Sequence, residues 1–144
     1  MPAHDLIHNA VKNALIKDGW TITADPFTLK FDAEIVYANL AAEKTIAAER
    51  AGEKIAVEIK SFLGPSQMRD FESAIGQYTI YRDFLKVLEP NRKPFIAISD
   101  TTYDDFFSRT GIQYVVRQNG IALIIVDIER EELVKWTNIT DTAP

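Results

Sequence analysis

Two charged side chains, Glu58 and Lys60, stand towards the far end of a run of residues, 54–62, that is largely apolar and β-branched after Lys54. The run predicts a short buried strand, and because side chains alternate across a strand, both charges project from the same face. Burying a charge without a partner is costly. The two groups therefore either pair with each other or with a neighbouring strand, or they hold a divalent metal and a water molecule.

The flanking sequence predicts the elements that would position these two side chains. Residues 43–50 read as a second strand, and the Gly-containing segment 51–53 supplies a hairpin loop. Gly64-Pro65 then breaks the chain, and Ser66 is suited to cap a long amphipathic helix over 66–88.

A strand, a tight turn, a strand ending in Glu-x-Lys and a helix bearing Gln-x-x-x-Tyr resemble the PD-(D/E)XK nuclease superfamily, which has the restriction-endonuclease-like fold. More narrowly, the chain resembles the XisH family, the fdxN element excision controlling factors. The matching blocks are Ala3-His4-Asp5 with His8, Lys17-Asp18-Gly19-Trp20, 43–49, 55–63, and Ile75-Gly76-Gln77-Tyr78 with Tyr81-Arg82. The resemblance implies DNA as the substrate, Mg²⁺ or Mn²⁺ as the cofactor, and a small XisI-type protein as a partner.

Metal-dependent phosphodiester hydrolysis needs oxygen ligands for a hard cation, a positioned water and positive charge near the reacting phosphate. Glu58 is the first candidate metal ligand, and the backbone carbonyl of Ile59 is the second. Lys60 is the candidate for orienting the water or stabilising charge. These three residues predict one catalytic and metal-binding site at the end of the strand.

A second acid must come from the neighbouring strand. Nuclease-like folds usually place an Asp early in that strand, but the sequence has no Asp between Asp32 and Asp70. Glu43, which opens the predicted strand, is the best substitute as catalytic residue and metal ligand. Glu49 is the alternative, although it lies close to the turn.

Gln77 and Tyr81 are one helical turn apart and share a face, and the resemblance places such a pair beside the metal and the DNA. The alternative is a helix with one buried Tyr and one surface Gln.

His4 and His8 are also one turn apart, with Asp5 between them, but the third ligand and the Glu of zinc sites are missing. His8 either takes the place of the acid that many nuclease-like folds project from their first helix, or it is an ordinary surface histidine.

Composition limits the classes of function. The chain has 144 residues, a formal net charge of −5 and no cysteine, which excludes disulfides, thiolate catalysis and cysteine-ligated zinc. The net charge argues against a non-specific nucleic-acid coat protein. No apolar run is long enough to span a membrane and no secretory signal is visible, so we expect a cytoplasmic protein. The oligomeric state, a homo-oligomer included, stays open.

The order of the expected elements indicates one α/β domain over residues 1–144, with a central mixed β-sheet flanked by helices. We expect a helix over 4–18, strands over 20–23 and 95–98, and a helix that Ser99 or Asp100 caps. Residues 27–42 are ambiguous between strand and helix. We also expect strands over 112–117 and 121–127, joined by an Asn119-Gly120 turn.

Two functions are compatible with these patterns. The first is a metal-dependent nuclease-like domain that acts on DNA, or an accessory factor in the excision of a DNA element. The second is a non-catalytic interaction module that keeps the nuclease fold, in which Glu58 and Lys60 form a structural ion pair and the XisI-type protein is the partner. The missing Asp favours the second function, and the intact Glu-x-Lys and Gln-x-x-x-Tyr patterns favour the first.

Overall fold

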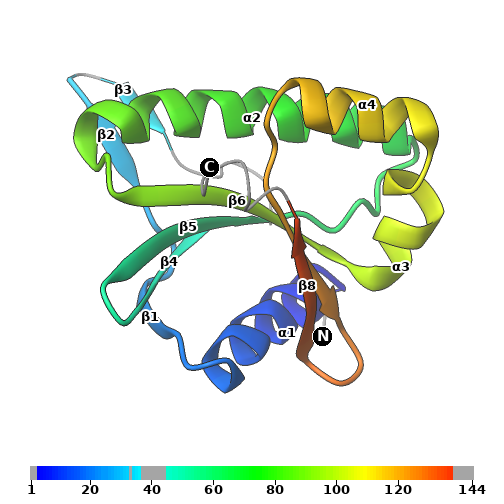
Figure 1. Cartoon of the computed structure of the whole chain (residues 1–144), viewed down its shortest axis with the longest axis horizontal. Coiled ribbons are helices and arrows are strands. Elements are labelled where there is room, and N and C mark those ends of the chain that lie inside the picture. Colours follow the sequence, from blue (N-terminus) through cyan, green and yellow to red (C-terminus); the bar gives the residue numbers. More distant parts are fainter. Residues whose placement is uncertain (1–2, 33, 37–44, 138–144) are drawn as a thin grey trace.

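The computed structural model of the chain describes residues 3–32, 34–36 and 45–137. A six-stranded mixed sheet forms its centre, in the order β1-β4-β5-β6-β7-β8 (Figure 1). The strands are β1 (Thr21–Ala24), β4 (Thr45–Arg50), β5 (Glu53–Ile59), β6 (Arg92–Ser99), β7 (Leu123–Asp127) and β8 (Glu132–Thr137). β5, β6 and β7 are parallel, whereas the outer pairs are antiparallel. The α/β class with a central mixed sheet is therefore confirmed.

Helices cover both faces of this sheet (Figure 1). Helix α1 (Ala3–Lys17) packs on one face through Val11, Ala14 and Leu15, which are buried against Val57 and other apolar strand residues. Helix α2 (Gln67–Leu88) and helix α4 (Thr110–Gln118) lie on the other face, together with the short α3 (Asp100–Thr102) and the π-helix η1 (Tyr103–Phe107). Strand β5 is therefore buried on both faces.

The hairpin and the capped helix around the Glu-x-Lys segment form as the sequence predicts, but β5 begins at Glu53, which was expected in the loop, and ends at Ile59, before Lys60. β4 and β5 pair as an antiparallel hairpin, and the tight turn between them uses positive φ angles at Ala51 (51°) and Gly52 (87°). The Ser66 side chain accepts a hydrogen bond of 3.2 Å from the Arg69 amide and caps α2. The apolar segment 95–98 lies within β6, an internal strand of the sheet.

The expected strand over 112–117 is wrong, because these residues belong to α4. The β-branched residues of this segment favour a strand locally, but Ile112 and Val116 are four residues apart and are both buried against the sheet, as one face of a helix requires. Asn119-Gly120 consequently ends a helix and does not form a hairpin turn. The edge strand β8, which pairs with β7, has no counterpart in the sequence-based expectations.

The ambiguous segment 27–42 contains a small separate sheet. β2 (Leu29–Phe31) and β3 (Glu34–Val36) pair antiparallel beside the C-terminal half of α2, where the Phe31 and Phe84 rings lie 4.9 Å apart. Residues 34–36 are thus a strand and not part of a helix, whereas 37–42 lie outside the described residues. No described helix is both long enough and apolar enough to cross a membrane.

Candidate metal-binding and catalytic site

Glu58 is a buried acid in the middle of the sheet. It pairs with Thr45 on β4 and with Ile96 on β6, and only 2% of its surface is exposed. Neither carboxyl oxygen has a hydrogen-bond partner among the described residues. Burial raises the pKa of Glu58 from 4.5 to about 8, although the nearby Lys60 charge opposes this rise. At neutral pH the carboxyl group is therefore mostly protonated unless a cation replaces the proton.

Strand alternation places Glu58 on the face that α2 covers. Val57 and Ile59 belong to the cluster around α1, whereas Ala56 packs with Tyr81 of α2. Glu58 shares the face of Ala56. Its carboxyl group therefore points into the layer between β5 and α2.

Lys60 lies on the same side as Glu58, as the sequence predicts. Its ammonium group donates a short hydrogen bond to the Gln77 side-chain carbonyl on α2, and its backbone amide bonds to the Ala97 carbonyl at 3.0 Å. Within the part of the chain that the structure describes, Lys60 forms no ion pair with Glu58, and neither Glu58 oxygen accepts or donates a hydrogen bond. The structural ion pair of the interaction-module hypothesis is therefore not observed there.

Two tyrosines of α2 close this layer. Tyr81 is buried with Ala47 and Ala56, so Gln77 and Tyr81 do face the sheet together. Tyr78, which the sequence-based site omits, donates a hydrogen bond to the Pro94 carbonyl at 3.2 Å and accepts one from the Ala122 amide at 3.1 Å. These bonds fix α2 over the sheet. Burial raises the pKa of Tyr78, and the nearby Glu58 charge adds to this effect, whereas the Ala122 bond opposes it.

The structure does not bring every predicted acid to this layer. Glu43 lies outside the described residues. Glu49 is four residues beyond Thr45 on β4, about 13 Å along the strand, and its carboxylate lies 3.5 Å from the Arg92 guanidinium. Among the described residues, no three acidic or histidine side chains cluster as metal ligands would. Glu58 is thus the described carboxylate that fits a cation site, with the backbone of Ile59 beside it.

His8 belongs to a different environment from Glu58. It lies on α1, on the opposite face of the sheet, and its Nε2 is 3.0 Å from Oδ2 of Asp25. Lys12 donates to the same Asp25 oxygen at 2.7 Å. Burial raises the pKa of Asp25, but the bonds to Lys12 and His8 outweigh this effect and lower it. His4 instead forms a hydrogen bond of 3.1 Å with Ser61, so the contacts described for the two histidines are with different residues.

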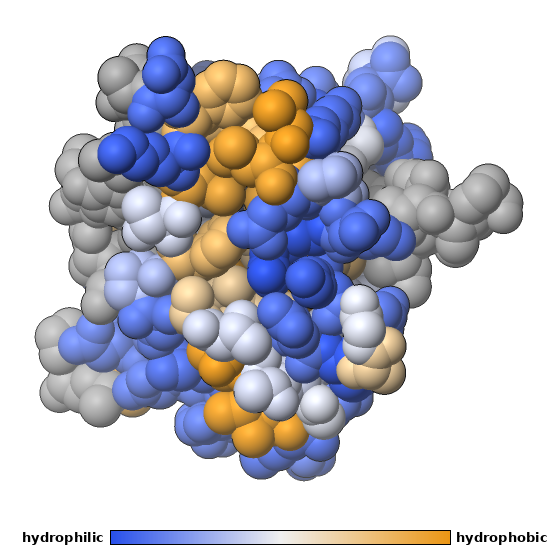
Figure 2. All heavy atoms as spheres, turned by 90° about the vertical axis from the view of Figure 1, so that its left-hand side faces the viewer, coloured by the Kyte–Doolittle hydropathy of each residue, from blue (hydrophilic) through white to orange (hydrophobic). Residues whose placement is uncertain are grey.

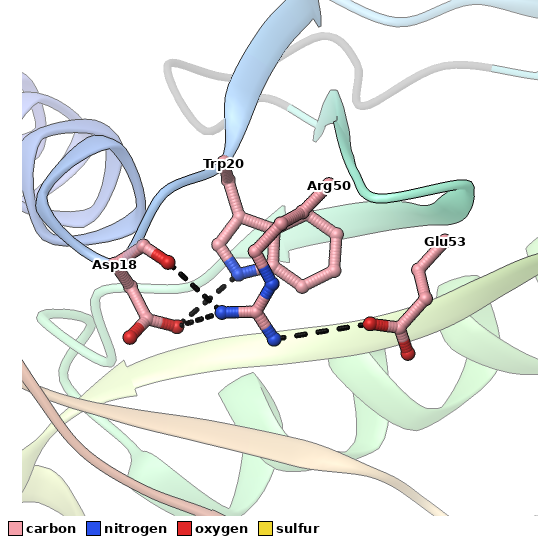
Figure 3. Close-up of polar contacts among 4 residues, drawn as sticks. All are labelled: Asp18, Trp20, Arg50 and Glu53. Carbon is pink, nitrogen blue, oxygen red and sulfur yellow. Dashed lines mark hydrogen bonds and ion pairs between the residues drawn. The ribbon is translucent and has the colours of Figure 1, made fainter.

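Asp18 and Trp20, from the Lys17-Asp18-Gly19-Trp20 block, contact Arg50 of β4 (Figure 3). The Arg50 guanidinium donates to the Asp18 carboxylate at 2.7 Å and to the Asp18 carbonyl at 2.9 Å. It also lies 4.4 Å from the Trp20 ring centroid and 3.8 Å from the Glu53 carboxylate. Arg50 therefore ties the β4–β5 hairpin to the end of α1, and its charge is engaged away from Glu58.

Thr45 and Tyr78 are the site neighbours that the sequence-based reasoning missed. Thr45 lies directly opposite Glu58, is fully buried, and its hydroxyl has no hydrogen-bond partner among the described residues. Strand register supplies the signal that would have found it, because pairing across the two-residue turn Ala51-Gly52 aligns residue 45 with residue 58.

Comparisons with known proteins agree with this architecture. The family model described as XisH protein matches residues 1–134. An XisH family protein from Nostoc punctiforme PCC 73102 has 41% sequence identity and a TM-score of 0.85, with 92% of this chain and 98% of that chain covered. A protein from Anabaena variabilis, described as a fdxN element excision controlling factor, has 40% identity and a TM-score of 0.84 over the same shares. A comparison with curated proteins gave no match. The chain therefore belongs to the XisH family.

Proposed function

We propose that the chain is a metal-dependent, nuclease-like domain that acts on DNA during the excision of a DNA element. The observation that carries this proposal is the carboxyl group of Glu58, which is buried without a hydrogen-bond partner among the described residues and lies beside Lys60. Groups of this kind are rare in folded proteins and call for an explanation such as an ion or a water. Strongly perturbed acids are also enriched at functional sites.

The residues present fit a hard divalent cation in part. Glu58 offers carboxylate oxygens, which Mg²⁺ and Mn²⁺ prefer, and Glu43 is the second acid of the proposal. A bound cation would supply Lewis-acid activation of a phosphodiester and of water. Lys60, held by Gln77, would orient a water or stabilise negative charge at the phosphate.

DNA nicking tests the proposal directly. We expect purified protein with Mg²⁺ or Mn²⁺ to convert supercoiled plasmid to the nicked form, and Glu58→Gln to abolish the conversion. Glu72→Gln is the matched control, because Glu72 is an exposed acid on α2. Folding of all three proteins is checked by circular dichroism. Absence of nicking by the wild type, with either metal and with or without an XisI-type protein, would refute the enzymatic proposal.

A second candidate function, binding of a small XisI-type protein, is favoured by the surface of the molecule. The face on the left-hand side of Figure 1 carries an apolar patch surrounded by hydrophilic side chains (Figure 2). Helix α2 ends on this side, and its C-terminal half exposes Ile80 (47%), Val87 (65%) and Leu88 (39%). Ile80 and Val87 are seven residues apart and so lie on the same side of α2. Exposed apolar surface is typical of protein-binding sites.

This second function predicts a separate set of sensitive residues. Val87→Glu should weaken the binding of an XisI-type protein by at least about tenfold, because it places a charge in an apolar contact. Val134→Glu on β8 is the control, since Val134 is also exposed, at 52%, but lies on another element. Equal affinity of the wild type and Val87→Glu in a calorimetric titration would exclude this surface.

A further inference from the structure

Thr45 and Glu58 face each other across the β4–β5 hairpin. They are directly paired in the register of this antiparallel ladder, and paired residues project from the same face of the sheet with their Cβ atoms about 5 Å apart. The next pair on this face supports this assignment, since Ala47 and Ala56 pack together under α2. Both side chains therefore enter the layer between the sheet and α2.

Both groups are buried and neither is satisfied by the described protein atoms. Thr45 is 0% exposed and Glu58 is 2% exposed. The Thr45 hydroxyl and both Glu58 oxygens lack a hydrogen-bond partner in the described part of the chain, so they also do not bond to each other. Two adjacent polar groups that leave one another unpaired in a protein interior point to a third group between them, such as an ion or an ordered water.

Packing alone does not account for the hydroxyl. Valine has nearly the shape of threonine and a similar preference for strands, and it would fill the same volume without a buried polar atom. Threonine hydroxyls are also established ligands of Mg²⁺ in phosphate-handling proteins. The hydroxyl is therefore best explained by a polar group that it contacts.

We infer that Thr45 supplies a second oxygen donor to the cation that Glu58 binds. This inference rests on the proposed metal site and extends it to a residue on the neighbouring strand. β4 then contributes to the site through the residue opposite Glu58. The side chain of Thr45 is stiff at χ1, so its hydroxyl would hold a fixed position relative to the carboxylate.

Titration with Mn²⁺ alone, followed by electron paramagnetic resonance of the free ion, tests the inference. Thr45→Val should weaken binding of Mn²⁺ by about tenfold or more, because one oxygen donor is lost while the volume is kept. Thr45→Ser, which restores the hydroxyl, should bind within about threefold of the wild type, a rescue that a purely structural role would not produce. Glu58→Gln should abolish binding.

The stability of the metal-free variants completes the test. Thr45→Val should unfold at an equal or higher urea concentration than the wild type in the presence of a chelator, since it removes a buried unpaired hydroxyl. If Thr45→Val does not fold, Thr45→Ala is used in its place in both measurements. Wild-type affinity in Thr45→Val together with lost binding in Glu58→Gln would overturn the role of Thr45 and leave the Glu58 site intact. Absence of Mn²⁺ binding by the wild type would overturn both.

Discussion

Replacement of Glu58 by Gln should change the pH dependence of stability more than any other single substitution in the sheet. The pKa of Glu58 is raised from 4.5 to about 8 by burial. The folded protein therefore keeps a proton on Glu58 up to about pH 8, whereas the unfolded chain releases it above about pH 4.5. The free energy of unfolding consequently falls as the pH rises through this window. The destabilisation that comes from ionising buried Glu58 is absent below the unfolded-state pKa and complete above the folded-state pKa.

The size of this loss of stability follows from the shift in the pKa of Glu58. A difference of about 3.5 pH units corresponds to about 5 kcal/mol in total. Between about pH 5 and pH 8.5 the wild type should lose about 4 kcal/mol through this one group. Glu58→Gln keeps the shape of the side chain and cannot ionise, so it should lack this loss. The two proteins should be similarly stable near pH 5, and the variant should be more stable at pH 8.5.

Urea denaturation at several pH values, with a chelator present, measures the difference between the two proteins. Subtracting the Glu58→Gln curve from the wild-type curve removes the contributions of all other titrating groups if they are independent. Added Mn²⁺ should flatten the wild-type curve, because a cation that binds only the folded state stabilises it and replaces the proton. Parallel pH profiles for the two proteins without metal would show that Glu58 ionises normally, and would refute the reasoning from its burial.

Three further predictions concern neighbouring groups. Lys60→Met should reduce metal-dependent DNA nicking by about 10²-fold with little change in the urea midpoint. Lys54→Met, which removes an exposed charge from β5, should leave nicking unchanged, and a large loss of stability in Lys60→Met would instead favour a structural role. The apparent Kd for Mn²⁺ should fall about tenfold for each pH unit between about pH 6 and pH 8, since the cation displaces the Glu58 proton, and a flat calorimetric profile would contradict this exchange. Arg92→Met should lower the free energy of unfolding by about 3 kcal/mol without changing Mn²⁺ affinity, because it removes a buried cation bonded to the Ile55 carbonyl, and a change in affinity would show that the two regions are coupled.

The core of the candidate site could be predicted from the sequence because it depends on local periodicity. Glu58 lies in β5 and Lys60 directly follows its last residue, so the alternation of side chains along the strand predicts a shared side. Gln77 and Tyr81 are four residues apart on a helix and share a face for the same kind of reason. The contact between Lys60 and Gln77 needs in addition that α2 folds back over β5, which the Gly64-Pro65 break and the Ser66 cap make possible.

The remaining differences come from interactions that single-sequence patterns do not carry. Residues 110–118 have strand-like composition, and only their packing against the sheet selects the helix. The partner of Glu49 is Arg92, which is 43 residues away in sequence. The sequence around Glu49 therefore does not show that this carboxylate is engaged away from Glu58. The role of Tyr78 likewise depends on contacts with β6 and the segment before β7.

A crystal of the protein soaked in Mn²⁺, with diffraction measured at the manganese absorption edge, tests directly whether Glu58 binds a divalent cation. We expect an anomalous peak within about 2.5 Å of a Glu58 carboxylate oxygen, with the Thr45 hydroxyl directed towards it and Lys60 still bonded to Gln77. The same soak with the Glu58→Gln variant should show no such peak. A wild-type crystal without manganese at this position, in which the Glu58 carboxyl group bonds to a protein atom instead, would show that Glu58 is not a metal ligand.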